Sequence, residues 1–176
     1  MGLFFTADTH FGHYNIIKYD TRPFTDSREH DETIIRNWNE IVGPKDEVYH
    51  LGDFAFKNRR PIETYIKELN GKIHFIRGNH DDKAAWKIRH MFESAREAAY
   101  IRYEGYMIYL SHYACRTWRN SFHGSWHLYG HSHGKLPPLG LSMDVGIMLN
   151  NYYPFSFEQI KEFMENRNNQ ELEEKA

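Results

Sequence analysis

The sequence predicts a mixed α/β fold built as one domain. In the first half of the chain, short apolar strand segments alternate with amphipathic helical segments, which favours crossover connections and a largely parallel sheet. In the second half, a hairpin and further short strands dominate, which favours antiparallel pairing. The 176 residues, with 40% apolar and 16% aromatic content, suffice for one hydrophobic core. We expect a single domain over residues 1–167 and a polar, flexible tail over 168–176.

The elements of the first half follow from local patterns. Ile34 and Trp38 recur at helical spacing, and Gly43-Pro44 stops that helix. A second helix carries Pro61 in its first turn, where the missing N–H costs nothing. The elements expected here are, in order, a strand at 3–7, a polar loop from Asp8 to about His30, a helix at 31–42, a strand at 47–51, a helix at 60–71 and a strand at 72–77.

The second half is predicted to be richer in strands. Two alternating segments joined at Glu104-Gly105 indicate a hairpin. Ser156 and Gln159 form a capping box at the start of the last helix. The elements expected here are a helix at 82–92, strands at 98–103, 106–112, 125–130 and 141–147, and a helix from 157.

Composition narrows the class of partner and the compartment. A formal net charge of −2 gives no global basic field for nucleic acid or an anionic membrane. Cys115 is the single cysteine, so no internal disulfide forms. No apolar run approaches the ~20 residues of a membrane span, and the first residues lack a signal-peptide pattern. We expect a cytoplasmic protein without a membrane partner; the sequence sets no oligomeric state.

Five apolar strand segments end in Asp, Asn or His, and the chain holds 12 histidines in all. These segments are LFFTADTH, VYHLGDF, HFIRGNHD, IYLSH and LYGHSH. Ligands of open α/β sheets bind outside the carboxyl ends of the strands, so these endings are expected to converge. The residues concerned are Asp8, His10, Asp53, Asn79, His80, Asp81, His112, His131 and His133.

Carboxylates, imidazoles and one carboxamide without a thiolate suit Mn²⁺, Fe or Zn²⁺ in a hydrolytic site. The set is too large for one ion, and two ions need a bridging carboxylate, for which either Asp8 or Asp53 is available. Glycine precedes a ligand at several strand ends, where it lets the backbone turn and approach the ions. Asp8 with His10, like His131 with His133, would point to one side in extended backbone.

The motifs DTH, GDF, GNHD, SH and GHSH, in this order, resemble the signature of the calcineurin-like metallophosphoesterase superfamily. The stretches DTHFGHYNIIKYDTRPF and MDVGIMLNNYYPFSFEQI are similar to its small, single-domain bacterial and bacteriophage members. The resemblance implies a four-layer αββα sandwich, in which two mixed β-sheets are flanked by helices. It also implies a phosphoester substrate, two divalent metal ions, Mn²⁺ before Fe, Zn²⁺ or Ni²⁺, and in-line attack on phosphorus by a metal-bridging hydroxide.

The resemblance also implies a role for each residue. His80 would assist the leaving oxygen, and Asp81 would fix the tautomer of His80. One metal would be held by Asp8, His10, Asp53 and His133, and the other by Asp53, Asn79, His112 and His131.

The substrate is interpreted as a phosphodiester of nucleotide or nucleic-acid type. A phosphomonoesterase of the same fold and a catalytically silent metal- or RNA-binding module remain alternatives. Candidate substrate contacts are His13, Asn15 and Arg22 in the first loop, and Arg116, Trp118 and Arg119 in a loop that interleaves cations with aromatics. For that second loop, packing of its aromatics on the core is an equal alternative.

Two other enzyme classes are excluded, and five histidines are assigned no function. A cysteine-dependent phosphatase would need an arginine six positions after Cys115, where Ser121 stands. GHSHGK fails as a phosphate-binding loop because Leu136 follows its lysine. The histidines interpreted as structural are His30, His50, His74, His90 and His127.

Overall fold

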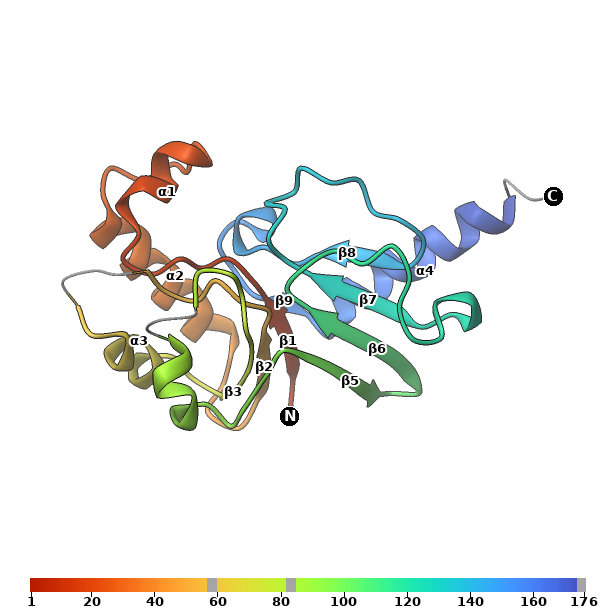
Figure 1. Ribbon diagram of the computed structural model, residues 1–176, viewed down its shortest axis with the longest axis horizontal. Helices are drawn as coiled ribbons and strands as arrows, with labels where there is room; N and C mark the ends of the chain where they lie inside the picture. Colours follow the sequence, from red (N-terminus) through yellow and green to blue (C-terminus); the bar gives the residue numbers. More distant parts are fainter. Residues whose placement is uncertain (57–59, 82–84, 174–176) are drawn as a thin grey trace.

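The computed structural model describes residues 1–56, 60–81 and 85–173. Two mixed sheets form its centre, with strand orders β4-β3-β2-β1-β9 and β5-β6-β7-β8 (Figure 1). The strands are β1 (Leu3–Thr6), β2 (Glu47–His50), β3 (Lys72–Ile76), β4 (Ser94–Arg96), β5 (Ala98–Tyr103), β6 (Tyr106–Ser111), β7 (Trp126–Tyr129), β8 (Ser142–Asp144) and β9 (Phe155–Ser156). The helices are α1 (Tyr14–Tyr19), α2 (Ser27–Ile41), α3 (Ile62–Glu68) and α4 (Phe157–Glu173), with 3₁₀ helices η1 (Ala85–Met91), η2 (Ser121–His123) and η3 (Ile147–Asn150). The predicted fold class, two mixed sheets with flanking helices, is confirmed.

In the first sheet, β1, β2, β3 and β4 are parallel and β9 is antiparallel to β1. Each parallel connection in this sheet passes through helical structure, the usual crossover between parallel strands. Figure 1 shows α2 and α3 beside this sheet, and the fully buried Ile34 and Trp38 of α2 pack in one cluster with Val48 and Phe75. Because the four strands run in one direction, the residues that follow β1, β2 and β3 emerge at the same edge.

The second sheet contains the predicted hairpin of β5 and β6, which turns at Glu104 (φ 47°) and Gly105 (φ 86°). However, β6, β7 and β8 pair in parallel, so the expectation of antiparallel pairing is wrong for these strands. The reason is that loops serve as the crossovers here: the chain between β6 and β7 returns across the sheet with only the short η2 in it. The carboxyl ends of β6 and β7 therefore also share one edge.

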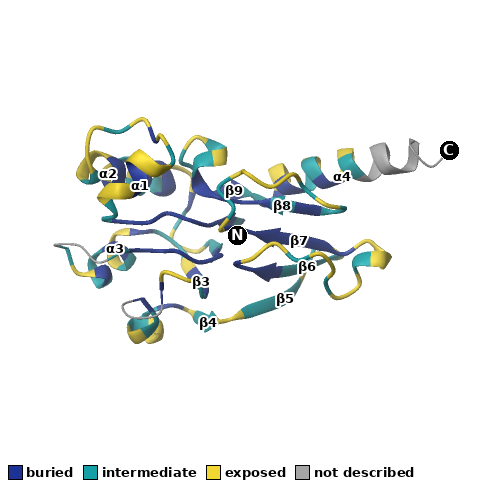
Figure 2. Cartoon of the chain, turned by 45° about the horizontal axis from the view of Figure 1, so that its top comes forward, coloured by how far each residue is buried: buried dark blue, intermediate teal, exposed yellow. Residues whose placement is uncertain are grey.

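A second cluster of buried residues fills the space between the sheets. Phe5 of β1, Leu110 of β6 and Leu128 of β7 belong to it, each fully buried. Helix α4 packs on the same cluster through Phe157, whose ring lies 5.9 Å from that of Trp126. Figure 2 shows β7 as buried along its length, whereas α1 and α2 carry exposed residues on their outer sides.

The capping box is confirmed, while several boundaries differ from the prediction. Gln159 Oε1 accepts from Ser156 N at 2.9 Å, and Gln159 N donates to Ser156 Oγ at 3.3 Å. Helix α2 begins at Ser27, four positions before the predicted start, because the carboxylate of Asp26 caps its first turn. The first loop contains the short helix α1, and the unpredicted strands β4 and β9 extend the first sheet.

The last two predicted helices also change in extent. The helix expected at 82–92 is the 3₁₀ helix η1, interrupted by non-helical backbone at Ile88, and residues 82–84 lie outside the described ranges. Helix α4 extends to Glu173, and residues 174–176 are likewise not described, so the flexible tail stays a prediction. No helix in the described part of the chain is long and apolar enough to cross a bilayer.

Candidate metal centre

The five polar strand endings converge on one place. A backbone hydrogen bond joins the two sheets there. Ala7 N donates to Val145 O at 3.0 Å, and these residues directly follow β1 and β8. The groups that gather there are Asp8, His10 and His133 in one cluster and Asp53, His112 and His131 in another, each with ligand atoms within 4.8 Å of one another.

The carboxylate of Asp53, which belongs to the second cluster, also approaches the first. Its Oδ2 is 3.7 Å from His10 Nε2 and 3.5 Å from His112 Nε2. Asn79 Oδ1 is 3.0 Å from His112 Nε2, which adds the predicted carboxamide to the second cluster. The structure thus brings together all seven side chains that the sequence offered as metal ligands.

Five of these seven residues have left-handed backbone, which is uncommon for residues other than glycine and costs roughly 1 kcal/mol or more each. The extended backbone expected around them is therefore wrong, since the strands end before the motifs and the chain turns back. As a result, His131 and His133 serve different clusters although they are only two positions apart. The φ angles are 57° at Asp8, 48° at His10, 55° at Asp53, 66° at His131 and 49° at His133.

Glycines make room for the carboxylates and imidazoles, as the sequence indicated. A Cβ on Gly52 would lie 2.5 Å from His112 Nδ1, and a Cβ on Gly130 would lie 2.8 Å from Asp8 Oδ2. A Cβ on Gly78 would collide with the backbone amide and the carboxylate of Asp53. Only a residue without a side chain fits at these three positions.

Gly78→Ala is expected to lower the free energy of unfolding by about 1–3 kcal/mol, the usual cost of overpacking, because backbone atoms must move to admit the methyl group. It should also weaken metal binding through displacement of Asp53. Urea unfolding and Mn²⁺ titration measure the two effects. The matched control is Gly43→Ala, whose Cβ would come no closer than 3.3 Å to a carboxylate oxygen of Asp46. Equal stability of both variants would contradict the expectation.

The two central carboxylates are held out of water. Burial raises the pKa of Asp8 to about 7, although His133 and His112 lower it. Burial would also raise the pKa of Asp53, but its contact with His112 outweighs burial and holds that pKa below its usual range. For His112, burial lowers the pKa, yet Asp53 raises it to about 9. A bound divalent cation would balance these buried carboxylates in place of the protons on His112 and Asp8.

His10 shows most directly that these residues fit a metal ion. The side chain is 2% exposed, and neither ring nitrogen has a hydrogen-bond partner among the described residues. Burial lowers the pKa of His10 well below its usual value, so the ring stays neutral and able to act as a ligand. A buried polar group without a partner is costly, and a metal ion would satisfy it. The donor set of carboxylates, imidazoles and a carboxamide agrees with this.

Two of the imidazoles are oriented by hydrogen bonds on the side away from the clusters. His112 Nδ1 donates to Leu51 O at 2.7 Å, and His133 Nδ1 donates to Asp20 Oδ2 at 2.5 Å. In both rings Nε2 is then the nitrogen that faces the carboxylates, as is usual for metal-binding histidines. Asp20 was not among the predicted site residues, because 113 positions separate it from His133 and no local spacing reveals the contact.

His80 and Asp81 are neighbours in sequence but make different contacts. The His80 side chain is exposed, and its ring centroid lies 5.6 Å from that of His10. The backbone N of His80 donates to Asp53 Oδ1 at 2.9 Å. Asp81 is fully buried, and its carboxylate accepts from the backbone N–H groups of Gly78, Asp53 and Phe54. Its contacts therefore clamp the turns after β2 and β3 together, which corrects the expectation that it orients the His80 ring.

The first-loop candidates for substrate contact separate by burial. Arg22 is only 4% exposed and donates to Asp8 O (3.0 Å), to His30 Nε2 (2.8 Å) and to Asp20 Oδ2 (3.1 Å). Its guanidinium is committed to the protein, so the predicted pairing with a substrate phosphate is wrong. His13 is half-buried and stacks on Phe56 with ring centroids 4.2 Å apart.

Asn15, the remaining candidate of the first loop, is exposed in α1. The second-loop candidates contact the second sheet. Trp118 Nε1 donates to Ser125 O at 3.0 Å, and the guanidinium of Arg119 lies 4.7 Å from the centre of the Tyr100 ring. These contacts support the packing interpretation of the loop, which was one of the two alternatives. Arg116 is exposed.

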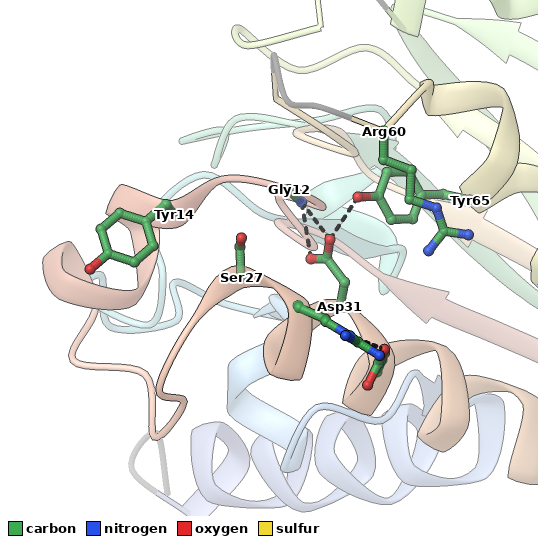
Figure 3. A pocket seen from close by; sticks show the side chains of 8 residues that line it. Gly12, Tyr14, Ser27, Asp31, Arg60 and Tyr65 are labelled. Carbon is green, nitrogen blue, oxygen red and sulfur yellow. Dashed lines mark hydrogen bonds and ion pairs between the residues drawn. The ribbon is translucent and has the colours of Figure 1, made fainter.

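A cavity of about 620 Å³ lies beside the first loop, bordered by α2 and α3 (Figure 3). Asp31 projects into it, and the carboxylate accepts from Gly12 N at 3.0 Å and from the hydroxyl of Tyr65 at 2.7 Å. The two arginines that line the cavity form ion pairs, Arg28 with Glu32 and Arg60 with Glu68. No member of the two clusters lines it, so this cavity is separate from the candidate metal centre.

The fold and the clusters fit a metal-dependent hydrolase of phosphoric esters, the class to which the family match assigns the chain. Residues 1–137 match the calcineurin-like phosphoesterase superfamily domain, and the chain belongs to that family. The expectation drawn from the five motifs is therefore confirmed at the level of family and enzyme class.

Two relatives and one solved structure of similar fold illustrate the similarity. An uncharacterized protein of Methanocaldococcus jannaschii is 37% identical over 172 residues, which cover 93% of this chain and 91% of that protein. The Gene 66 protein of Mycobacterium phage L5 is 34% identical over 80 residues, 44% of this chain and 38% of that protein. The crystal structure of a protein of unknown function from Aquifex aeolicus superposes with a TM-score of 0.73 at 24% identity, covering 92% of this chain and 98% of that one.

Proposed function

We propose that the protein is a dinuclear phosphodiesterase acting on a substrate of nucleotide or nucleic-acid type. The observation that carries the proposal is the position of Asp53 Oδ2, within 3.7 Å of His10 Nε2 and 3.5 Å of His112 Nε2, one from each cluster. A carboxylate oxygen placed in this way suits the shared ligand of two ions. The residues that would hold one ion are Asp8, His10, Asp53 and His133, and those for the other are Asp53, Asn79, His112 and His131.

Two bound divalent ions would lower the pKa of a water between them and withdraw charge from the phosphoryl oxygens. Mn²⁺ is the proposed metal, and the mixed imidazole and carboxylate donors also suit Fe, Zn²⁺ or Ni²⁺. The protein's own contribution is to fix the ligands: Leu51 O orients His112, and Asp8 accepts from the backbone N–H of His131 at 2.9 Å. Preset ligands need no reorganisation during the reaction.

His80 is proposed to assist the leaving oxygen. Its side chain is exposed beside His10 and belongs to neither cluster of ligand atoms, so it is available to a bound substrate. An imidazole within hydrogen-bond reach of the scissile bond can donate the proton that the leaving alkoxide needs.

Two observations favour a diester that carries a base. The buried Arg22 is committed to protein acceptors, so it is not available as the bidentate clamp that suits a dianionic monoester. Tyr113, which is 51% exposed, lies with its ring centroid 4.7 Å from that of His131 and 5.1 Å from that of His112. An exposed aromatic ring beside the ligands is suited to stacking with a nucleobase.

Hydrolysis of bis-p-nitrophenyl phosphate by the chelator-stripped protein, with and without Mn²⁺, tests the proposal. We expect turnover that requires Mn²⁺ and exceeds turnover of p-nitrophenyl phosphate. Preference for the monoester would support the phosphomonoesterase alternative. Binding of two Mn²⁺ without hydrolysis of either compound would support the silent binding module.

A further inference from the structure

We propose that Asp20 is a positioning residue that holds His133 as a ligand and thereby sets the affinity of one of the two ion sites. The inference rests on the proposed dinuclear function. It assigns Asp20 to the cluster of Asp8, His10 and His133 and predicts that the cluster of Asp53, His112 and His131 is independent of it.

The contact between Asp20 and His133 fixes which nitrogen of the imidazole faces the ion. His133 Nδ1 donates to Asp20 Oδ2 at 2.5 Å, and the two side chains are 13% and 6% exposed. With the proton on Nδ1, the lone pair lies on Nε2, which is 3.7 Å from Asp8 Oδ1. A carboxylate behind a metal-binding imidazole fixes the ring and makes it a stronger donor.

Asp20 is itself held in place by Arg22. The guanidinium donates to Asp20 Oδ2 through Nη2 at 3.1 Å and through Nε at 3.3 Å. The same Nη2 donates to the backbone carbonyl of Asp8 at 3.0 Å. One buried guanidinium therefore ties the carboxylate that orients His133 to the backbone of a second ligand in the same cluster.

Behind Arg22 the network returns to the loop that carries His10. Arginine cannot accept a hydrogen bond, so His30 Nε2 accepts from Arg22 at 2.8 Å and His30 Nδ1 donates to Asp31 at 2.9 Å. Asp31 in turn accepts from Gly12 N at 3.0 Å, two positions after His10. The histidine interpreted as structural from the sequence thus supports the same network.

The second cluster is oriented by different means. The outer nitrogen of His112 donates to a backbone carbonyl, Leu51 O, rather than to a side chain. The carboxylate of Asp53 accepts from the backbone N of His80 at 2.9 Å. A change at Asp20 should therefore act on one site and not on both.

The test is Mn²⁺ binding to the chelator-stripped Asp20→Asn variant. Titration calorimetry measures the affinities, and electron paramagnetic resonance reports on the bound ions. Asparagine keeps the shape and an acceptor oxygen but loses the charge. We expect one site with unchanged affinity and one weakened about 10- to 100-fold, the usual cost of losing such a partner. At two equivalents of Mn²⁺, the spectrum of a coupled pair should give way to that of an isolated ion.

The matched control is Lys135→Gln. Lys135 Nζ lies 3.9 Å from Asp20 Oδ1, and its side chain is 72% exposed, so it should leave both sites unchanged. In the His133→Ala background, Asp20→Asn should weaken binding no further, because its effect passes through that imidazole. This cycle distinguishes positioning from a general loss of structure.

Equal weakening of both sites, unchanged binding in Asp20→Asn, or a further loss in the His133→Ala background would each overturn the proposal. Failure of the unsubstituted protein to bind Mn²⁺ would instead overturn the dinuclear function on which it rests.

Discussion

Asp53→Asn is expected to abolish binding of the two metal ions and to lower turnover more than about 100-fold. This exceeds the usual effect of residues that only support a ligand. The reason is geometric and electrostatic. Oδ2 of Asp53 lies within 3.7 Å of an imidazole nitrogen of each cluster, and contact with His112 holds the pKa of Asp53 low, so the group stays charged. A neutral amide offers one oxygen in place of two and no charge to balance the two cations.

The measurement is Mn²⁺ stoichiometry by titration calorimetry, together with hydrolysis of bis-p-nitrophenyl phosphate. Asp46→Asn provides the same chemical change away from the clusters, since the Asp46 carboxylate accepts from the backbone of Gly2 and Gly43. It should retain two ions and full turnover. An Asp53→Asn variant that binds two ions and retains activity would remove Asp53 from the bridging position.

The parts of the fold that were predictable from the sequence depend on local patterns. Helical spacing of Ile34 and Trp38 reveals α2, and alternation around Glu104-Gly105 reveals the hairpin of β5 and β6. Pairing between distant segments leaves no such trace. The parallel register of β6 and β7, and the two-residue strand β9 beside β1, depend on how the two sheets close around their shared core.

For the candidate site too, local sequence patterns predicted some features and not others. The side chains of the two clusters were recognisable because each follows a short apolar strand, and the carboxyl ends of parallel strands meet. Burial was not recognisable: Arg22 reads as a loop cation, yet it is enclosed beside Asp8 and bonded to Asp20. Asp81 likewise adjoins His80 in sequence but binds backbone amides instead.

His80→Ala is expected to keep both ions and to lower kcat on the order of 100-fold or more. His80 is exposed next to His10 but outside both clusters, so its loss removes a proton donor without removing a ligand. The effect should be smallest for substrates with good leaving groups, because these depart without protonation. Mn²⁺ titration and kcat for a series of aryl phosphodiesters of rising leaving-group pKa measure both parts.

The dependence on the leaving group separates proton donation from other roles of His80. His90→Ala is the control, since His90 is exposed in η1 and should show no change. If the side chain only positioned the substrate, kcat would fall by the same factor across the series, which would contradict the proton-donor role. Loss of an ion in His80→Ala would also contradict it, because its contact with Asp53 is through the backbone N, which alanine retains.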